Sequence, residues 1–398
     1  MTHEPIQLVF MAHLPFPKGM AGTQHLIHRM VSLRSYPEVT TRMLVLRQGR
    51  DFASDNAPSG AYEGIEYHTL GARMRPGPAA FFGLPGYFAE GLRFLKRWRK
   101  ADTRNLLFVY GPPSSDNWLF TRYARRLGYR VAYYLVEDIR VQGHAGDFFA
   151  RIKHGTGVFL TRRIGRLADA VLVISRRLQD QIEPLVDGRC PVRRLPICVD
   201  LDAIVPADRP FGNPVRLLYG GTFAEKDNVE LLLEAFETLC SRGRDLRLAL
   251  TGRGSPDRMD AIRKRIEATA CRDRIDWLGY LDAGDYFRRL GKFDILCMTR
   301  GSSAFAQAGF PFKLGEYLAT GRPVIASRVS DIAEYLTDRQ DAVLIEPDSV
   351  AGIIEGVEWL LAHPDLARQI GLAGRKAAEQ FFDVRRQSRT LLELLESL

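Results

Sequence analysis

One segment, 308–327, places a cation, a carboxylate and a predicted helix start within a few residues (Ala-Gly-Phe-Pro-Phe-Lys-Leu-Gly-Glu-Tyr-Leu-Ala-Thr-Gly-Arg-Pro-Val-Ile-Ala-Ser). The pattern predicts a loop, a helix with Pro311 as its first residue and Gly321 at its end, and a buried strand. The first N–H groups of such a helix attract anions. Lys313 would add positive charge, and Glu316 could accept hydrogen bonds from a diol such as a ribose. The alternative is an ordinary α/β helix whose Lys and Glu are solvated.

A second candidate loop, 220–228 (Gly-Gly-Thr-Phe-Ala-Glu-Lys-Asp-Asn), joins a predicted strand at 215–219 to a predicted helix at 229–240. Glycines let a ligand approach the backbone closely. Lys226 stands just before the helix, where it could meet a diphosphate. The alternative is a solvated loop lysine.

A third loop, 15–23, follows a predicted opening strand at 7–12 and precedes a predicted helix at 24–33. A strand, a glycine loop and a helix start make a site that phosphate can approach. The loop lacks the Gly-x-Gly-x-x-Gly pattern, which counts against a dinucleotide-binding motif. A plain turn is the alternative.

These segments resemble those of GT-B glycosyltransferases of the family 4 type, retaining enzymes that use nucleotide-diphosphate sugars. The family often carries Glu-x7-Glu before a Gly-x-Pro-Val-Ile strand entry; the second Glu matches Glu316, and Ala308 occupies the position of the first. The lysine of the family's Gly-Arg … Lys-Gly loop matches Lys226, but Thr222 replaces the arginine. Lys313 is a candidate substitute for the missing cation.

The resemblance implies that different residues of the donor site bind different parts of the nucleotide sugar. Lys226 and Lys313 would bind the diphosphate, Glu316 the ribose, residues 278–280 the base, and Gly22 with its neighbours would face them. The residues expected to bind the donor are Gly22, Gly220, Gly221, Thr222, Lys226, Gly252, Leu278, Gly279, Tyr280, Phe310, Phe312, Lys313, Leu314 and Glu316. Lys226, Lys313 and Glu316 are also expected to take part in catalysis.

Three further catalytic candidates follow a predicted strand at 130–136, on the acceptor side: Glu137, Asp138 and His144. A structural role is the alternative for each. No metal or cofactor is expected, because fixed cations and helix N-termini can stabilise a departing diphosphate. An Asp-x-Asp pair at 200–202 has the pattern by which GT-A enzymes hold a metal, but it stands at a predicted linker turn.

Strands and helices alternate throughout, which predicts α/β architecture with parallel sheets. The expected fold class is two doubly wound, Rossmann-like domains facing across a cleft, the GT-B architecture. Residues 1–200 would form the acceptor-side domain, 201–214 a linker, 215–380 the nucleotide-sugar domain, and 381–398 a helix that returns to the first domain.

The composition is that of a globular protein, with 46% hydrophobic and 26% charged residues, a net charge of +9 and a pI near 9.4. No apolar run is long enough for a membrane span, and the start does not resemble a signal peptide. Five scattered cysteines favour a cytosolic protein with reduced thiols. No nucleic-acid-binding motif is present, so the basic charge favours anionic substrates or a membrane surface as partners.

Two basic amphipathic stretches, 84–100 and 151–166, bear on the membrane alternative. Such a helix can lie on an anionic bilayer at the inner face of the membrane. It can equally pack its apolar stripe on a sheet and leave its cations in water.

The leading hypothesis is a retaining, metal-independent glycosyltransferase that acts on a glycan or lipid-linked cell-envelope acceptor. Two alternatives remain: a nucleotide-sugar epimerase, and an inactive nucleotide-sugar-binding or membrane-docked partner. Turnover of a donor with and without acceptor separates the three.

Overall fold

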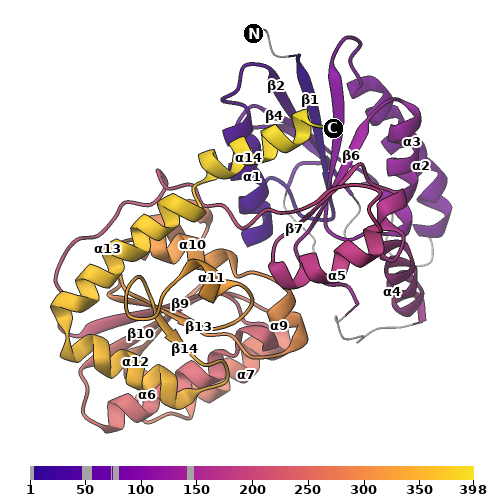
Figure 1. Ribbon diagram of the computed structural model, residues 1–398. Coiled ribbons are helices and arrows are strands. Elements are labelled where there is room, and N and C mark those ends of the chain that lie inside the picture. The colour runs from indigo at the N-terminus through magenta and orange to yellow at the C-terminus, as the bar shows by residue number, and fades with distance from the viewer. Residues whose placement is uncertain (1–3, 47–55, 73, 75–79, 141–147) are drawn as a thin grey trace. The chain divides into compact units, whose positions relative to one another are not determined.

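The computed structural model describes residues 4–46, 56–72, 74, 80–140 and 148–398. The chain divides into two α/β units (Figure 1). Unit 1 comprises residues 1–196 and 385–398, and unit 2 comprises residues 197–384. Each unit is built on its own sheet, and the predicted fold class of two doubly wound α/β units is confirmed.

The sheet of unit 1 has the strand order β3-β4-β2-β1-β5-β6-β7-β8 among the described residues. All neighbours are parallel except β3, which pairs antiparallel with β4. The strands are β1 (Ile6–Ala12), β2 (Val39–Val45), β3 (Ser59–Tyr62), β4 (Ile65–Thr69), β5 (Arg104–Tyr110), β6 (Arg130–Leu135), β7 (Ala170–Val173) and β8 (Val192–Arg194). Every residue of β1 is buried, as expected for a central parallel strand covered on both faces.

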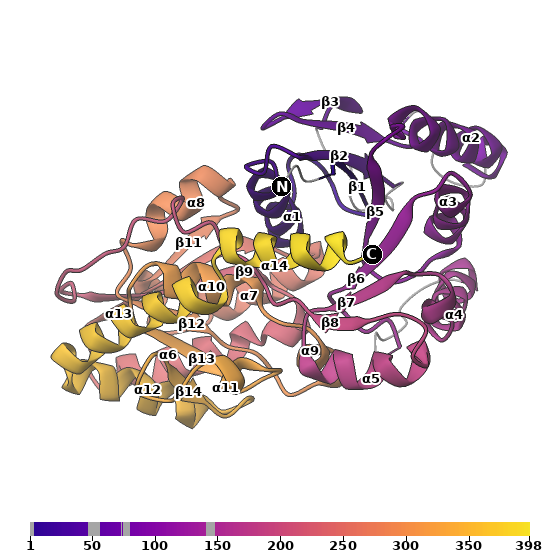
Figure 2. The ribbon, with the colours of Figure 1, turned by 45° about the horizontal axis from the view of Figure 1, so that its top comes forward.

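Helices cover both faces of this sheet. Figure 2 shows α1 and α14 on one face and α2, α3 and α4 on the other. The helices of unit 1 are α1 (Ala21–Leu33), α2 (Ala80–Trp98), α3 (Ser115–Arg126), α4 (Phe148–Thr161), α5 (Arg176–Val186) and α14 (Val384–Glu396), with a short 3-10 helix, η2 (Ile164–Arg166), after α4. The late segment α14 is joined to the rest of the unit by Arg29, which is fully buried and donates to the carbonyls of Gln387 and Pro196, each at 3.4 Å.

Unit 2 has an all-parallel sheet with the order β11-β10-β9-β12-β13-β14. Its strands are β9 (Val215–Thr222), β10 (Leu246–Arg253), β11 (Ile275–Gly279), β12 (Ile295–Met298), β13 (Val324–Ser327) and β14 (Val343–Ile345). Its helices are α6 (Val229–Ser241), α7 (Pro256–Glu267), α8 (Ala283–Leu290), α9 (Ala304–Ala308), α10 (Phe312–Ala319), α11 (Ile332–Tyr335), α12 (Val350–Ala362) and α13 (Pro364–Phe381), with 3-10 turns at Glu225–Asp227 and Arg272–Arg274. Strands β9 and β12 are neighbours although β10 and β11 intervene in sequence, so the direction of winding reverses at this point.

Two helix starts differ from the sequence-based prediction. Pro311 has extended backbone (ψ 114°) and is the N-cap of α10, so Phe312 rather than Pro311 is the first helical residue. Helix α1 begins at Ala21 rather than Gln24, which places Gly22 in the first helical turn instead of the loop. The predicted end of α10 is confirmed, because Gly321 follows the helix with a φ of +69°.

The apolar side of the basic helix α2 packs into the interior of unit 1. Tyr87, Leu95 and Trp98 are buried, and the indole of Trp98 donates to Glu66 at 3.2 Å. Lys96 and the neighbouring cations are exposed. The alternative in which the stripe packs on the sheet therefore describes this helix.

The unit boundaries fall after Pro196 and Val384, where the sequence analysis placed them after residues 200 and 380. Val199 is tied to unit 2 by two backbone bonds, from its N–H to the Phe382 carbonyl (2.8 Å) and from the Val384 N–H to its own carbonyl (3.0 Å). These bonds assign residues 197–200 to unit 2 rather than to unit 1.

A buried carboxylate attaches the segment 201–214 to the sheet of unit 2. Asp294, which has no exposed surface, accepts hydrogen bonds from the guanidinium groups of Arg209 and Arg322 and from the backbone N–H of Arg216, each at 2.8 Å. The backbone N–H of Gly212 donates to the same carboxylate at 3.2 Å. Each oxygen of the Asp294 carboxylate thus accepts at least one hydrogen bond, which offsets the cost of burying its charge.

Replacing Asp294 with Ala should destabilise the full chain by about 3–5 kcal/mol, because it leaves Arg322 buried without a counter-ion. Urea unfolding of the full-length protein measures this loss. The exposed Asp273→Ala variant is the matched control and should unfold as the wild type does. Equal midpoints for both variants would contradict the assigned role of Asp294.

Candidate functional site

Three chain segments of unit 2 meet beyond the carboxyl ends of its central strands. They are the loop that follows β9, the residues that follow β12, and the first turn of α10. The Gly301 N–H donates to the Lys226 carbonyl at 3.0 Å, and the Thr299 hydroxyl donates to the Asp227 carbonyl at 3.3 Å. The candidate loop 220–228 is therefore held against the end of β12. In open α/β sheets this edge, at the reversal of winding, is where ligands bind.

A buried carboxylate, Asp227, forms the centre of this arrangement. Lys313 Nζ lies 3.4 Å from Asp227 Oδ1, and Arg300 Nε lies 3.7 Å from the same oxygen. The Thr222 hydroxyl donates to the other oxygen, Oδ2, at 2.5 Å. All three charged groups are buried, with 2% to 9% of each residue exposed. Two cations and one anion therefore share a site with little water, which leaves a net positive charge for an incoming anion.

The neighbouring charges and burial shift the pKa values of the Asp227 carboxyl and the Lys313 amine. Burial alone would raise the pKa of the Asp227 carboxyl, but the positive charges of Lys313 and Arg300 outweigh burial and lower it. Burial lowers the pKa of the Lys313 amine, and the Asp227 carboxylate opposes that shift. The Arg300 Nε atom is buried and has no hydrogen-bond partner in the described structure. An unmatched buried donor of this kind is available to a ligand.

The backbone leaves room for the Lys313 side chain only because position 221 is glycine. A Cβ atom on Gly221 would lie 2.8 Å from Lys313 Nζ, and its φ of +145° is disfavoured for other residues. The amine also lies 4.1 Å from the ring centroid of Tyr219, so an aromatic face stabilises its charge. Gly252, on the adjacent strand, permits another close approach, because a Cβ there would lie 1.8 Å from the Gly221 carbonyl oxygen.

Glu316 lies on the same helix as Lys313 and belongs to a tyrosine cluster. Tyr286 donates a hydrogen bond to the Glu316 carboxyl, and it is also hydrogen-bonded to Tyr317. The Tyr317 hydroxyl accepts from the Gly220 N–H at 2.7 Å and donates to the Gly220 carbonyl at 3.2 Å. Glu316 is only half-buried, but desolvation raises the pKa of its carboxyl from 4.5 to about 7. Near neutral pH it can therefore be either a donor or an acceptor.

The other predicted donor residues of unit 2 fall into two groups. Lys226 is half-buried, with its amine 4.3 Å from the ring centroid of Phe305. Tyr280 is 47% exposed and is covered by the guanidinium of Arg253, 3.9 Å from its ring centroid. Leu278, Gly279 and Phe312 are partly exposed. The side chains of Phe310 and Leu314 are buried in the core, so only their backbone could face a ligand.

The described acceptor-side candidates, Glu137 and Asp138, do not form a charged cluster like the one around Asp227. Asp138 is buried and binds the guanidinium of Arg140 through both oxygens, at 2.9 and 3.0 Å, which favours its structural alternative. Glu137 is half-buried at the end of β6. His144 lies outside the described residues.

Unit 1 instead brings together a polar cluster that sequence reasoning missed. Asp116 accepts hydrogen bonds from Ser114 (2.6 Å) and Tyr87 (2.9 Å) and lies 3.3 Å from His13 Nε2. Burial would raise the pKa of the Asp116 carboxyl, but the hydrogen bond and charge of His13 hold it well below its usual range. His13 and Ser114 each follow the carboxyl end of a strand, β1 and β5, and this position was the available signal.

Two members of the unit 2 site were also missed, Asp227 and Arg300. Both follow strand ends in chemically suitable loops, yet neither matches a residue of the family pattern. Arg300 supplies a guanidinium to Asp227, the carboxylate that also accepts a hydrogen bond from Thr222. In the described part of the chain no three His, Cys, Asp or Glu side chains are grouped closely enough to hold a metal ion.

The Asp227–Lys313 pair should be energetically coupled. Asp227→Asn should cost about 3 kcal/mol of stability, since it leaves buried cations without a counter-ion. Lys313→Met should cost less, because Arg300 still neutralises the Asp227 carboxylate. The double variant should lose about 1–3 kcal/mol less than the sum. Denaturant unfolding of the four proteins measures the coupling, and the exposed Arg263–Asp260 pair is the control. Strict additivity at Asp227 and Lys313 would show that the pair does not interact.

The raised pKa of Glu316 should make stability fall between pH 4.5 and 7. The unfolded chain releases this proton near pH 4.5 and the folded chain near pH 7, so rising pH favours unfolding across that window. Glu316→Gln should remove a decline of about 3 kcal/mol. Thermal unfolding of both proteins from pH 4.5 to 8 is the measurement, with the exposed Glu267→Gln variant as control. Parallel pH profiles for wild type and Glu316→Gln would refute the shift.

Comparisons with known proteins find similarity in the unit that contains this site. Residues 203–377 match the family model "Glycosyl transferases group 1". The GDP-mannose-dependent α-(1-6)-phosphatidylinositol monomannoside mannosyltransferase of Mycolicibacterium smegmatis is 26% identical over 247 residues, 59% of this chain and 64% of the relative. A glycogen synthase of Mycobacterium tuberculosis is 24% identical over 61% of this chain and 57% of its own. The matches thus span less than two thirds of the length of these curated relatives.

Solved structures match over nearly the whole chain. Sucrose-phosphate synthase of Thermosynechococcus elongatus has a TM-score of 0.74 at 18% identity, covering 99% of each chain. HepE of Anabaena in complex with UDP-glucose has a TM-score of 0.72 at 13% identity, covering 100% of each chain. These likenesses extend through both units, whereas the family model matches mainly unit 2. The chain therefore has the GT-B fold, and residues 203–377, within its second unit, match the group 1 glycosyl transferase model.

Proposed function

We propose that this protein is a retaining glycosyltransferase that transfers a sugar from a nucleotide-diphosphate sugar to a glycan or lipid-linked acceptor of the cell envelope. The observation that carries the proposal is the pair of buried cations, Lys313 and Arg300, at the strand ends of unit 2. The family match over residues 203–377 supports the reaction class. The printed names of the matched relatives support the donor class, since one is GDP-mannose-dependent and another structure holds UDP-glucose.

The demanding step of the reaction is the departure of the nucleoside diphosphate from the sugar. When the sugar leaves, the nucleoside diphosphate gains negative charge, and cations that are already in place stabilise it without reorganisation. Lys313 and Arg300 are such cations, and the first N–H groups of α10 add a partial positive charge. Glu316, next to them, would accept the ribose hydroxyls. These groups supply charge stabilisation from the protein alone, which is the basis for proposing metal independence.

In a retaining transfer of this type the leaving phosphate oxygen takes the proton of the acceptor hydroxyl, so no protein base is needed. The new glycosidic bond forms on the face of the sugar that the phosphate leaves. The α-linkage in the name of the matched mannosyltransferase supports a retaining outcome for a donor that is itself α-linked. We further propose that the protein works at the inner face of the membrane, where a lipid-linked acceptor would be available.

The epimerase alternative shares the donor site but needs no acceptor. The basis of the inactive-partner alternative is that Thr222 and Ala308 replace the arginine and the first glutamate of the family pattern. These replacements do not remove the site's positive charge, because Arg300 lies 3.7 Å from Asp227. No described feature favours either alternative over transfer.

Nucleotide binding tests the donor site directly. UDP, GDP and ADP, each with and without EDTA, are screened by thermal shift. One nucleotide at 100 times its Kd should stabilise the wild type by about 2.7 kcal/mol, with no effect of EDTA. Lys313→Met and Glu316→Ala should lose the shift, and the exposed Lys292→Met variant should keep it.

Transfer is then measured with the matching nucleotide sugar and lipid-linked or glycan acceptors. Lys313→Met should lower kcat roughly 100- to 1000-fold. No shift with any nucleotide would refute the donor site, and a shift that EDTA abolishes would refute metal independence. Donor conversion that needs no acceptor would favour the epimerase.

A further inference from the structure

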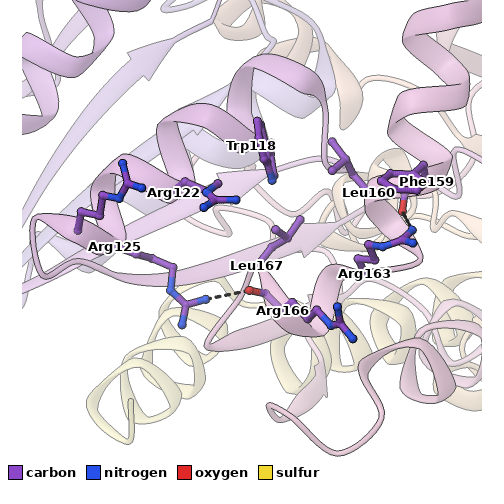
Figure 3. Close-up of a pocket in the computed structure, with 9 residues that line it drawn as sticks. Trp118, Arg122, Arg125, Phe159, Leu160, Arg163, Arg166 and Leu167 are labelled. Atoms are coloured by element: carbon purple, nitrogen blue, oxygen red, sulfur yellow. Dashed lines mark hydrogen bonds between the residues drawn. The ribbon is translucent and has the colours of Figure 1, made fainter.

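Unit 1 contains a pocket that the donor site does not involve. Its volume is about 580 Å³, and it lies between α3, α4 and the 3-10 helix η2 (Figure 3). Helix α3 starts after the carboxyl end of β5 and runs back along the sheet, so its last turns lie toward the amino ends of the strands. The pocket is thus on the side of the sheet away from the edge where ligands of such folds usually bind. The lining residues are Trp118, Arg122, Arg125, Arg126, Phe159, Leu160, Arg163, Arg166 and Leu167.

Five of the nine lining residues are arginines, and none is acidic. In the described structure only one of the five guanidinium groups forms an ion pair, that of Arg125 with Asp169 at 3.0 Å. The segment 148–167 contains no Asp or Glu at all. Like charges gathered in this way repel one another, and the repulsion is relieved when an anion binds.

The arginines are held in place by aromatic faces. The Arg163 guanidinium lies 3.7 Å from the ring centroid of Phe159, and that of Arg122 lies 5.3 Å from the ring centroid of Trp118. Arg125 also donates to the Arg166 carbonyl at 3.2 Å. In Figure 3 the side chains of Trp118, Leu160 and Leu167 lie between the arginines of α3, Arg122 and Arg125, and those after α4, Arg163 and Arg166. The pocket is therefore partly preorganised, which reduces the entropy cost of binding.

Apolar side chains stand exposed beside these cations. Phe159 and Ile152, both on α4, are 52% and 51% exposed. Arg151, Lys153 and Arg162, on or next to the same helix, are exposed as well. A soluble anion would need the cations but would gain nothing from these two apolar groups. Apolar and cationic groups together match the surface of an anionic bilayer, where acyl chains and phosphates meet.

We propose that the pocket binds the phosphate headgroup of an anionic phospholipid and docks unit 1 on an anionic membrane surface. Arg122, Arg163 and Arg166 contact the phosphate, and Phe159 and Ile152 enter the acyl boundary. This is attachment to one leaflet, since no helix among the described residues is long and apolar enough to cross a bilayer. The proposal does not depend on the donor site or on transfer activity.

Vesicle co-sedimentation of the full-length protein tests the docking site. The vesicles are phosphatidylcholine alone, or phosphatidylcholine with about one third phosphatidylglycerol. The wild type should bind only the anionic vesicles. Arg163→Ala/Arg166→Ala should bind them about 30-fold more weakly, as expected when two cations near an anionic surface are lost. Phe159→Ser should also bind more weakly.

The matched control removes two exposed cations from the other basic helix of unit 1, α2, as Lys96→Ala/Arg97→Ala. It should bind nearly as the wild type does. Equal weakening in both double variants would show that net charge alone drives binding, and greater weakening in the α2 variant would place docking on α2. Either result overturns the proposal.

Two further measurements complete the test. Competition with inorganic phosphate distinguishes a lipid headgroup from a soluble anion, and unfolding midpoints show whether each variant is folded. Inorganic phosphate at the ionic strength of the assay should not release the wild type; release would identify a soluble anion as the ligand and overturn the lipid assignment. Unfolding midpoints of all variants should match the wild type, because the replaced side chains are exposed. Unchanged vesicle binding by a folded Arg163→Ala/Arg166→Ala protein overturns the proposal, whatever the donor site does.

Discussion

The candidate site depends on one buried carboxylate, Asp227, which is shared by Lys313 and Arg300. Asp227 lies in the loop after β9, whereas Arg300 and Lys313 both lie in the connection between β12 and β13. The ion pairs therefore connect the loop after β9 to the end of β12 and to α10. Burying a lysine or an arginine without a counter-ion would cost several kcal/mol. Asp227 makes the burial tolerable and fixes the cations before any ligand arrives.

The same arrangement limits what the site can bind. A ligand phosphate would meet two cations that share the single charge of Asp227. Its gain comes mainly from the remaining net positive charge and from Arg300 Nε, which has no hydrogen-bond partner in the described structure. A dry site strengthens these interactions relative to water. Glu316 adds a group whose protonation changes near neutral pH, and its ability to accept hydrogen bonds from a diol should change with it.

The two cationic regions of the protein differ in a physically meaningful way. In unit 2 the cations are buried, paired and shaped by glycines, which suits recognition of one small anion. Around the α3–α4 pocket the arginines are exposed, mostly without ion pairs, and accompanied by exposed apolar side chains. Exposed charges are screened by salt and discriminate little between anions, which suits attachment to a surface with many phosphates. The net charge of +9 therefore serves two different tasks in this proposal.

Much of the fold could be predicted from local patterns. Buried strands such as β1 are continuous apolar runs, and Gly321 marks a helix end because its φ of +69° suits glycine. These features depend on residues adjacent in sequence. The family pattern pointed to Glu316, and the predicted helix start pointed to Lys313, since both signals depend on spacing within one short segment.

The partners of those residues were decided by tertiary structure alone. Arg300 and Asp227 meet only because β9 and β12 are neighbours in the sheet, although two strands separate them in sequence. Asp138 pairs with Arg140, while Asp116 gathers His13, Ser114 and a tyrosine from α2. The sequence determined which residues could carry charge at strand ends, since periodicity and glycine placement are local properties. Which charges met, and which of them lost contact with water, followed from strand order and burial, and these are properties of the whole fold.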